Sequence, residues 1–236
     1  GRHFRRTLLS IIGIGVGCGV CLLLVSFVRG EGDMIMRAAA HSGTGHLRVV
    51  PEQWEQTRER DLRLARWQQI LADMRGMDAL QVVAPRSRTD GLLAFGTRTA
   101  GVEMVGVDPR REPEMNRLVR DITAGRYLRP GERGSVVVGR AVADRLDVEV
   151  GDDLMVTASG EGDEMRSGML NIVGLVSTGS KQLDAGICQV TLPEVQELTG
   201  YEGAGEITAL VKDPKALAST VRTVESILPA GATVMT

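Results

Sequence analysis

The feature that most constrains this chain is a long uncharged run near its start, Thr7 to Val28. As an α-helix rising about 1.5 Å per residue, this run would extend roughly 33 Å, enough to cross a hydrocarbon core about 30 Å thick. Arg2, Arg5 and Arg6 precede it, and this excess of positive charge predicts a cytoplasmic N-terminus. We therefore expect a membrane anchor, with everything after Val28 on the far side of the membrane.

A cleaved signal peptide is the alternative interpretation of this run. The basic start fits one, and three consecutive alanines, Ala38 to Ala40, resemble a cleavage site. The apolar region of a signal peptide normally spans only about 7 to 15 residues, which is shorter than this run. The alanines also lie well beyond its end. An uncleaved transmembrane helix is the better explanation.

Four glycines alternate through the predicted span: Gly13, Gly15, Gly17 and Gly19. Two pairs among them are spaced four residues apart, the small-xxx-small spacing that lets helix backbones approach closely. This spacing predicts that other transmembrane helices pack against the glycine face. The same Gly-x-Gly run is not a nucleotide-binding fingerprint, because no strand precedes it and it lies in lipid.

Composition narrows the function classes further. The 236 residues leave room for one or two globular domains beyond the helix, and the net charge of -2 argues against nucleic acid as a partner. Aromatic residues make up 3% of the chain, so no stacking platform for bases or sugars stands out. Cys18 and Cys21 lie inside the apolar run and are interpreted as apolar helix residues. Cys188 is then alone, and no disulfide is expected.

Strand, helix and strand follow one another at both ends of the remaining chain. Near its start we expect a strand over 47–50, an amphipathic helix over 61–75 closed by Gly76 in a left-handed conformation, and a strand over 80–84. Near its end we expect a strand over 207–211, a helix opened by Asp213 and Pro214, and a strand over 232–235. The two sets can pair as the halves of a split βαβ, ferredoxin-like sheet.

A β-rich insert separates these two halves, preceded by a hairpin over 91–107. The predicted fold class is α+β, with one N-terminal transmembrane helix followed by a two-lobed extracytoplasmic domain. The domain division that we expect is 1–43 for the helix and its extension, 44–107 with 206–236 for the split βαβ lobe, and 108–205 for the β-rich lobe.

No catalytic or metal-binding set emerges from the sequence. The Gly179-Ser180-Lys181 tripeptide lacks the upstream glycine and strand of a phosphate-binding loop, so this chain is not expected to hydrolyse a nucleotide. His41 and His46 have no helical spacing or cysteine partner that would make them metal ligands. We therefore expect a non-catalytic chain without a bound cofactor or metal, and transport or interaction as its role.

Several stretches together resemble one family of membrane proteins. They are Arg5-Arg6-Thr7-Leu8-Leu9 with the glycines after it, Gly45-His46-Leu47-Arg48-Val49, Gly106-Val107-Asp108-Pro109, Gly125-Arg126-Tyr127-Leu128, and Val138-Gly139-Arg140-Ala141-Val142-Ala143 with Val150-Gly151-Asp152. In their order and spacing they are similar to the permease subunits of MacB/LolC/LolE-type (type VII) ABC transporters.

The resemblance implies a porter-like lobe and a smaller β-rich lobe in the periplasm of a bacterium, with the chain held in the inner membrane. It also implies three further transmembrane helices beyond Thr236, a second permease copy or a paralogue, and a cytoplasmic ABC ATPase that binds ATP and Mg²⁺. The substrate would be a lipoprotein or another membrane lipid. Drug or peptide efflux and regulation of cell-wall hydrolases stay open within the class. A single-pass anchored sensor or scaffold is the alternative from another class.

Two regions bear on the substrate. Bulky side chains follow the glycines in the outer half of the predicted span, among them Leu22, Val25, Phe27 and Val28, and these face either plain lipid or a pocket for acyl chains. The hairpin Ala158 to Gly168 corresponds to the hook with which one lipoprotein-releasing subunit recruits a soluble carrier. Here it is short, and Met165 is its only sizeable apolar residue. Carrier docking by this chain is therefore not expected.

Overall fold

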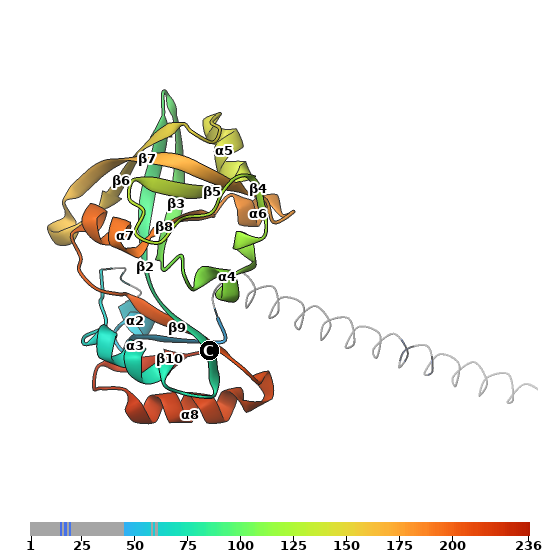
Figure 1. Cartoon of the computed structure of the whole chain (residues 1–236), viewed down its shortest axis with the longest axis vertical. Coiled ribbons are helices and arrows are strands. Elements are labelled where there is room, and N and C mark those ends of the chain that lie inside the picture. The colour runs from blue at the N-terminus through green and yellow to red at the C-terminus, as the bar shows by residue number, and fades with distance from the viewer. Residues whose placement is uncertain (1–14, 16, 18, 20–44, 58, 60) are drawn as a thin grey trace, which may run out of the picture. The chain divides into compact units, whose positions relative to one another are not determined.

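The computed structural model describes residues 45–57, 59 and 61–236, together with Gly15, Gly17 and Gly19. The described residues from Gly45 onward belong to one compact unit (Figure 1). No helix among the described residues is both long and apolar enough to cross a membrane. The predicted span lies outside them, except for its three described glycines, which are helical and exposed.

The first lobe is an antiparallel sheet of four strands in the order β10-β1-β9-β2. Its elements are β1 (Leu47–Pro51), α2 (Trp54–Thr57), α3 (Trp67–Arg75), β2 (Leu80–Phe95), β9 (Glu206–Val211), a 3₁₀ turn (Pro214–Ala216), α8 (Leu217–Ile227) and β10 (Ala232–Met235). The strands from the two ends of the chain alternate in this sheet. This is the split βαβ arrangement, because each helix connects two strands that have a third between them.

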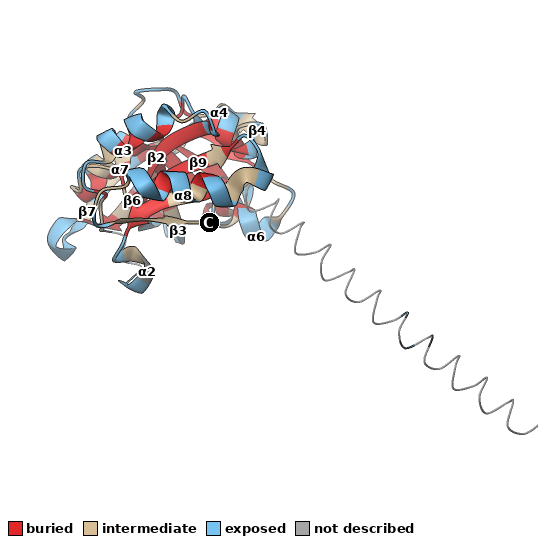
Figure 2. Cartoon of the chain, turned by 90° about the horizontal axis from the view of Figure 1, so that it is seen from below, coloured by how far each residue is buried: buried red, intermediate tan, exposed pale blue. Residues whose placement is uncertain are grey.

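Both long helices of the first lobe cover the same face of the sheet. Ile70 and Met74 of α3 and Val224 of α8 pack against the inward side chains of β1 and β9. Figure 2 shows α8 lying across the strands with its exposed side outward. The sequence predicted a helix that starts at Pro214, but a 3₁₀ turn occupies 214–216 and α8 begins at Leu217. Asp213 caps that turn by accepting a hydrogen bond from the Lys215 amide (2.9 Å).

The second lobe is a closed ring of six strands. In order around the ring, β2 pairs with β3 (Arg98–Val107), then β8 (Cys188–Thr191), β5 (Ser135–Gly139), β7 (Met165–Val176) and β6 (Asp153–Ser159), which returns to β2. Strand β4 (Ile122–Gly125) pairs with β7 outside the ring. Closure leaves no free sheet edge within the ring.

The core of the second lobe fills the ring. Strand β6 shows the pattern that produces it, with Leu154, Val156 and Ala158 buried and the residues between them facing outward. Helices α5 (Arg140–Leu146) and α7 (Leu192–Thr199) add apolar side chains to this core. The remaining short elements are α4 (Glu112–Met115), α6 (Lys181–Asp184) and the 3₁₀ turns Arg117–Val119 and Glu161–Asp163.

Strand β2 belongs to both lobes, and this differs from the sequence prediction. The predicted strand over 80–84 and the first arm of the hairpin are one continuous strand, Leu80–Phe95, which runs through both lobes in Figure 1. Pro85 lies inside this strand opposite Ile207, although proline has no amide N–H to donate to a ladder. Four residues of the range that the sequence assigned to the first lobe pack in the second core: Leu93, Ala100, Val102 and Met104. The domain division itself stays a prediction.

Two further details of the first lobe differ from expectation. The helix predicted over 61–75 begins only at Trp67, because Arg66 has a left-handed backbone (φ 54°) that a helix cannot contain. Before it, the Leu64 amide donates to the Ala204 carbonyl (2.9 Å) and the Leu64 side chain enters the core. Gly76 does close the helix, but in a right-handed conformation (φ -77°).

Candidate functional site at the junction of the two lobes

The residues that the sequence singled out for substrate contact and helix packing cannot be placed. Leu22, Val25, Phe27 and Val28 lie outside the described residues, and so does Gly13. A Cβ added at Gly15, Gly17 or Gly19 would meet no atom of the described residues within 4 Å. Their proposed contact with neighbouring helices stays a prediction.

A chain of alternating charges crosses four neighbouring strands at the junction. Glu206 on β9 accepts hydrogen bonds from Arg48 on β1 (Nη1 to Oε2, 3.0 Å) and from Arg88 on β2 (Nε to Oε1, 2.9 Å). Arg88 also donates from Nη1 to Glu103 Oε2 on β3 (3.1 Å). The chain therefore links the outer part of the first lobe to the ring of the second. Trp54 extends it, with its ring centre 5.2 Å from the Arg48 guanidinium carbon.

Glu206 is the centre of this ionic chain. Burial alone would raise its pKa, but Arg88, Arg48 and the more distant Arg86 outweigh burial, and the pKa of Glu206 lies below its ordinary value. The carboxylate is therefore charged throughout the neutral range. A charged side chain that is only 6% exposed is stable there because both of its oxygens are paired.

A second ion pair lies deeper at the same junction. Arg86 donates from Nε (3.1 Å) and Nη2 (2.6 Å) to a single oxygen of Glu112 at the start of α4, and both residues are almost completely buried. The other oxygen, Oε2, has no hydrogen-bond partner among the residues that the structure describes. Nearby, Tyr127 donates to Gln189 Oε1 (2.6 Å), and burial together with Glu112 holds the Tyr127 pKa well above its ordinary value. The Arg86–Glu112 pair fixes α4 against the middle of β2.

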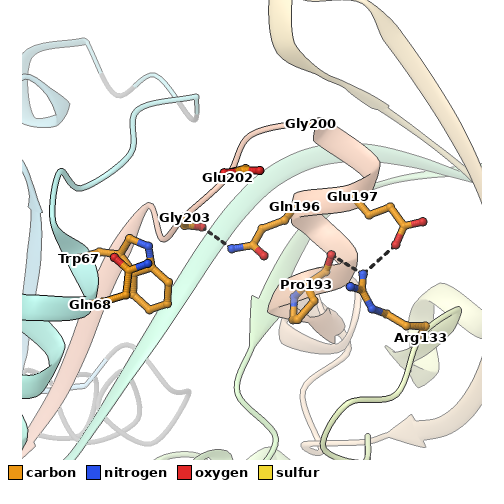
Figure 3. Close-up of a pocket in the computed structure, with 9 residues that line it drawn as sticks. All are labelled: Trp67, Gln68, Arg133, Pro193, Gln196, Glu197, Gly200, Glu202 and Gly203. Carbon is orange, nitrogen blue, oxygen red and sulfur yellow. Dashed lines mark hydrogen bonds and ion pairs between the residues drawn. The ribbon is translucent and has the colours of Figure 1, made fainter.

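An open cleft of about 690 Å³ lies between the lobes near these ion pairs, and we call it the interlobe cleft (Figure 3). Trp67 and Gln68, at the start of α3, form its first wall. Helix α7 of the second lobe forms the opposite wall through Pro193, Gln196 and Glu197, with Arg133 beside it. Gly200, Glu202 and Gly203 of the connection between α7 and β9 complete it.

The second wall is held rigidly. Arg133 Nη1 donates to the Pro193 carbonyl (2.7 Å) and to Glu197 Oε2 (2.8 Å). The next amide, that of Gly134, donates to Glu194 Oε2 (2.8 Å). These bonds fasten the segment before β5 to the first turn of α7, so the wall is formed before any ligand arrives.

Gly203 positions both walls of the cleft. Its carbonyl accepts a hydrogen bond from Gln196 Nε2 (2.9 Å), which leaves Gln196 Oε1 without a donor among the described residues. Its backbone has a φ of 97°, which residues other than glycine rarely adopt. A Cβ at this position would lie 3.3 Å from two atoms of the Trp67 indole. The indole therefore packs against bare backbone at the boundary between the lobes.

The hairpin after β6 is short, as the sequence indicated. β6 ends at Ser159 and β7 begins at Met165, which is 69% exposed. Two further methionines, Met155 and Met169, were not singled out from the sequence. They are opposite each other on the outer face of the same strands and are also exposed. Period-two alternation along β6 and β7 is the signal that would have found them.

This arrangement links the two lobes through ion pairs and provides a cleft in which a ligand can bind. Among the described residues, no group of histidine, cysteine and acidic side chains is placed to hold a metal ion. Burial raises the pKa of Cys188 to about 12, so its thiol stays protonated at neutral pH. The junction was not predicted from the sequence, although Arg86, Arg88 and Glu206 stand out as charged residues within strands whose other residues are mostly buried.

Comparison with known proteins identifies the family. The model of the MacB-like periplasmic core domain matches residues 7–227, which is nearly the whole chain. This chain belongs to the MacB-like periplasmic core domain family. The resemblance seen in the sequence is thereby confirmed, and the two lobes described above are this chain's version of that domain.

Curated relatives of this MacB-like chain are transmembrane proteins. The lipoprotein-releasing system transmembrane protein LolC of Neisseria meningitidis is 24% identical over 204 residues, which cover 81% of this chain and 46% of LolC. LolE of Haemophilus influenzae is 24% identical over 157 residues, covering 66% of this chain and 36% of LolE. The chain thus spans less than half the length of these relatives.

Solved structures show the same fold at low identity. The extracellular domain of the noncanonic ABC-type transporter YknZ from Gram-positive bacteria superposes with a TM-score of 0.56 at 14% identity, covering 80% of this chain and 98% of that domain. The periplasmic region of MacB from Actinobacillus actinomycetemcomitans gives 0.51 at 14% identity, covering 84% and 91%. The mixed α/β architecture of this MacB-like domain is therefore shared with both.

Proposed function

We propose that this chain is the anchor and extracytoplasmic domain of a permease subunit of an ABC transporter, located in a bacterial inner membrane with its N-terminus in the cytoplasm. The observation that carries the proposal is the family match over residues 7–227, which begins inside the predicted membrane span. Two relatives named as transmembrane proteins of lipoprotein-releasing systems support it. In this proposal the chain is not catalytic. A separate cytoplasmic ATPase binds ATP and Mg²⁺, and a second permease completes a dimer.

The role of the domain in this proposal is to transmit movement. Force from the membrane enters the first lobe, where the described chain begins next to β1. Strand β2 continues without interruption into the ring, and the ionic chain from Arg48 to Glu103 crosses the same junction. We expect the lobes to move as one body, because bending the junction would break hydrogen bonds to buried charges.

The substrate that we propose is a lipoprotein or another lipid-like molecule, with drug or peptide efflux as the alternative within the class. Leu22, Val25, Phe27 and Val28 are proposed to border its path in the membrane. The short hairpin with Met165 at its end favours a subunit that does not recruit a carrier, either the partner of one that does or a homodimeric permease.

The experiment is reconstitution of the full-length permease with its ATPase in proteoliposomes that hold a labelled lipoprotein. We expect ATP-dependent release, which Val25→Asn and Phe27→Asn each reduce while the complex still assembles. Ile227→Asn is the matched control, because Ile227 is an exposed apolar residue on α8. Absence of ATP-driven movement of both lipoproteins and efflux substrates would contradict the proposal.

The coding sequence beyond Thr236 provides an independent check. Three further apolar runs beside an ATPase gene support a transporter. A stop codon or a signalling domain at that point supports the single-pass sensor instead.

A further inference from the structure

The interlobe cleft contains polar groups that the fold leaves unused. Trp67 and Gln68 make no side-chain hydrogen bond among the described residues, and Gln196 uses its amide nitrogen but not its oxygen. Glu202 is exposed and has no ion-pair partner in the described part of the chain. A volume of about 690 Å³ is within the range of small-molecule sites, roughly 300 to 1,000 Å³.

The charges in the cleft disfavour an anionic ligand. Arg133 and Glu197 pair with each other at 2.8 Å, so neither presents an unbalanced charge. Glu202 leaves a single negative charge, which disfavours phosphates and other anions. The apolar part of the lining is too small for an acyl chain, since only Trp67 and Pro193 supply apolar rings. This cleft is therefore not a site for the lipid portion of a transported substrate.

The remaining chemistry fits a neutral, polyhydroxylated ring. An indole offers a flat apolar surface on which the C–H face of a sugar can rest, together with one N–H donor. Planar amide and carboxylate groups, here Gln68, Gln196 and Glu202, accept or donate to neighbouring hydroxyls with two atoms at once. Although aromatic residues are few in this chain, the fold places one of its two tryptophans beside these groups.

A peptide fits less well. Peptides add to a free sheet edge or dock on a groove lined by several aromatic rings. The residues that line the cleft come from α3, α7 and connections, so no strand edge faces it, and Trp67 is its single aromatic residue among the described ones.

We propose that the interlobe cleft binds a neutral carbohydrate, with one sugar ring against the Trp67 indole and hydroxyls on the Gln68, Gln196 and Glu202 side chains. The ligand bridges both lobes, because Trp67 belongs to the first and Gln196 to the second. The site is separate from the transport path proposed above, and its test does not depend on transport.

The test uses the full chain in phospholipid nanodiscs, which avoids sugar-containing detergents. Three neutral oligosaccharides serve as probes: N,N′-diacetylchitobiose, maltotriose and cellotriose. In a Trp54→Phe background Trp67 is the remaining tryptophan, so its fluorescence reports on the cleft directly. We expect saturable binding of at least one probe with a change in Trp67 emission, confirmed by calorimetry on the unmodified chain.

Two variants, one in each wall of the cleft, test whether the sugar binds there. Trp67→Ala and Gln196→Leu should each weaken binding by about tenfold or more, corresponding to about 1.4 kcal/mol. Should Trp67→Ala impair folding, Gln196→Leu decides, and Leu183→Ala on exposed α6 is the control that should bind normally. Absence of binding by all three sugars would overturn the proposal. So would binding that both variants leave unchanged, or a neutral proline-rich peptide that binds instead with the same dependence on Trp67.

Discussion

The two lobes solve the problem of burying a sheet in different ways. The first lobe keeps an open sheet and covers one face with α3 and α8, so its core lies between two layers. The second closes six strands into a ring and places its core inside, with α5 and α7 packed against it. Strand β2 joins the two arrangements, because it pairs with β9 up to Arg86 and with β3 from Ser87 onward.

The largest effect is expected at the junction between the lobes. Glu112→Ala removes the carboxylate to which the buried Arg86 guanidinium donates, and breaking a buried ion pair on one side typically costs about 3–5 kcal/mol. Urea unfolding measures the loss. The double variant Arg86→Met with Glu112→Leu should recover most of it, because no charge is then left unpaired. A double variant as unstable as the single one would show that the pair itself, and not the stranded charge, stabilises the junction.

Core substitutions compare the lobes directly. Leu154→Ala leaves a cavity inside the ring, and Met74→Ala leaves a cavity between α3 and the first sheet. Each should lower the free energy of unfolding by about 2–5 kcal/mol, because both side chains are fully buried. Unfolding followed by circular dichroism should show one transition in both variants, since β2 couples the lobes. Two separate transitions in either variant would mean that the lobes are stable independently.

Lowering the pH should reduce the stability of both the junction and the second lobe, and added salt should distinguish the two effects. The pKa of Glu206 is lowered in the folded state, and the hydrogen bond from Arg126 lowers that of Glu132, in the second lobe, to about 2. The stability that each carboxylate contributes is present above the unfolded pKa of about 4.3 and is lost as the pH falls through the folded value. Unfolding between pH 7 and 3 should show this loss.

Glu206→Gln and Glu132→Gln should each flatten that pH dependence. Salt near 1 M shortens the Debye length to about 3 Å and should abolish the contribution of the part-exposed Glu132 pair while leaving that of buried Glu206. Equal sensitivity to salt would show that the junction is open to water.

The smallest effect concerns one helix of the first lobe. Asp213→Ala removes the side chain that accepts from the Lys215 amide, and the loss of such a cap costs about 1 kcal/mol. Thermal unfolding should register it, and Asp213→Asn, which keeps the acceptor, should stay near the unmodified chain. Equal stability of the alanine and asparagine variants would show that the cap does not stabilise the 3₁₀ turn that leads into α8.

Local patterns predicted the elements well, and tertiary contacts decided the rest. Alternation along β6 and the Asp213-Pro214 pair specify a strand and a helix start without help from distant residues. The continuity of β2 through Pro85 depends on β9, because Ile207 pairs with that position. The start of α3 depends on the left-handed backbone of Arg66 and on the distant Ala204, whose carbonyl accepts a hydrogen bond from the Leu64 amide.

The ion pairs at the junction could not be predicted from the sequence for the same reason. Glu206 lies 158 residues from Arg48 and 118 from Arg88, and no spacing rule connects positions so far apart. Trp67 could be recognised as one apolar position of a helix, but its place beside Gln196 follows only from how the lobes meet.

The central claim is that β2 and the charges beside it make the lobes one body during transport. Hydrogen exchange on the full-length permease with its ATPase, in the ATP-bound and the nucleotide-free state, tests this most directly. The account predicts that amides over residues 82–94 stay equally protected in both states, even as the membrane helices rearrange. A rise in exchange around residues 85–90 in one state alone would contradict it, because the lobes would then hinge at the strand that is proposed to couple them.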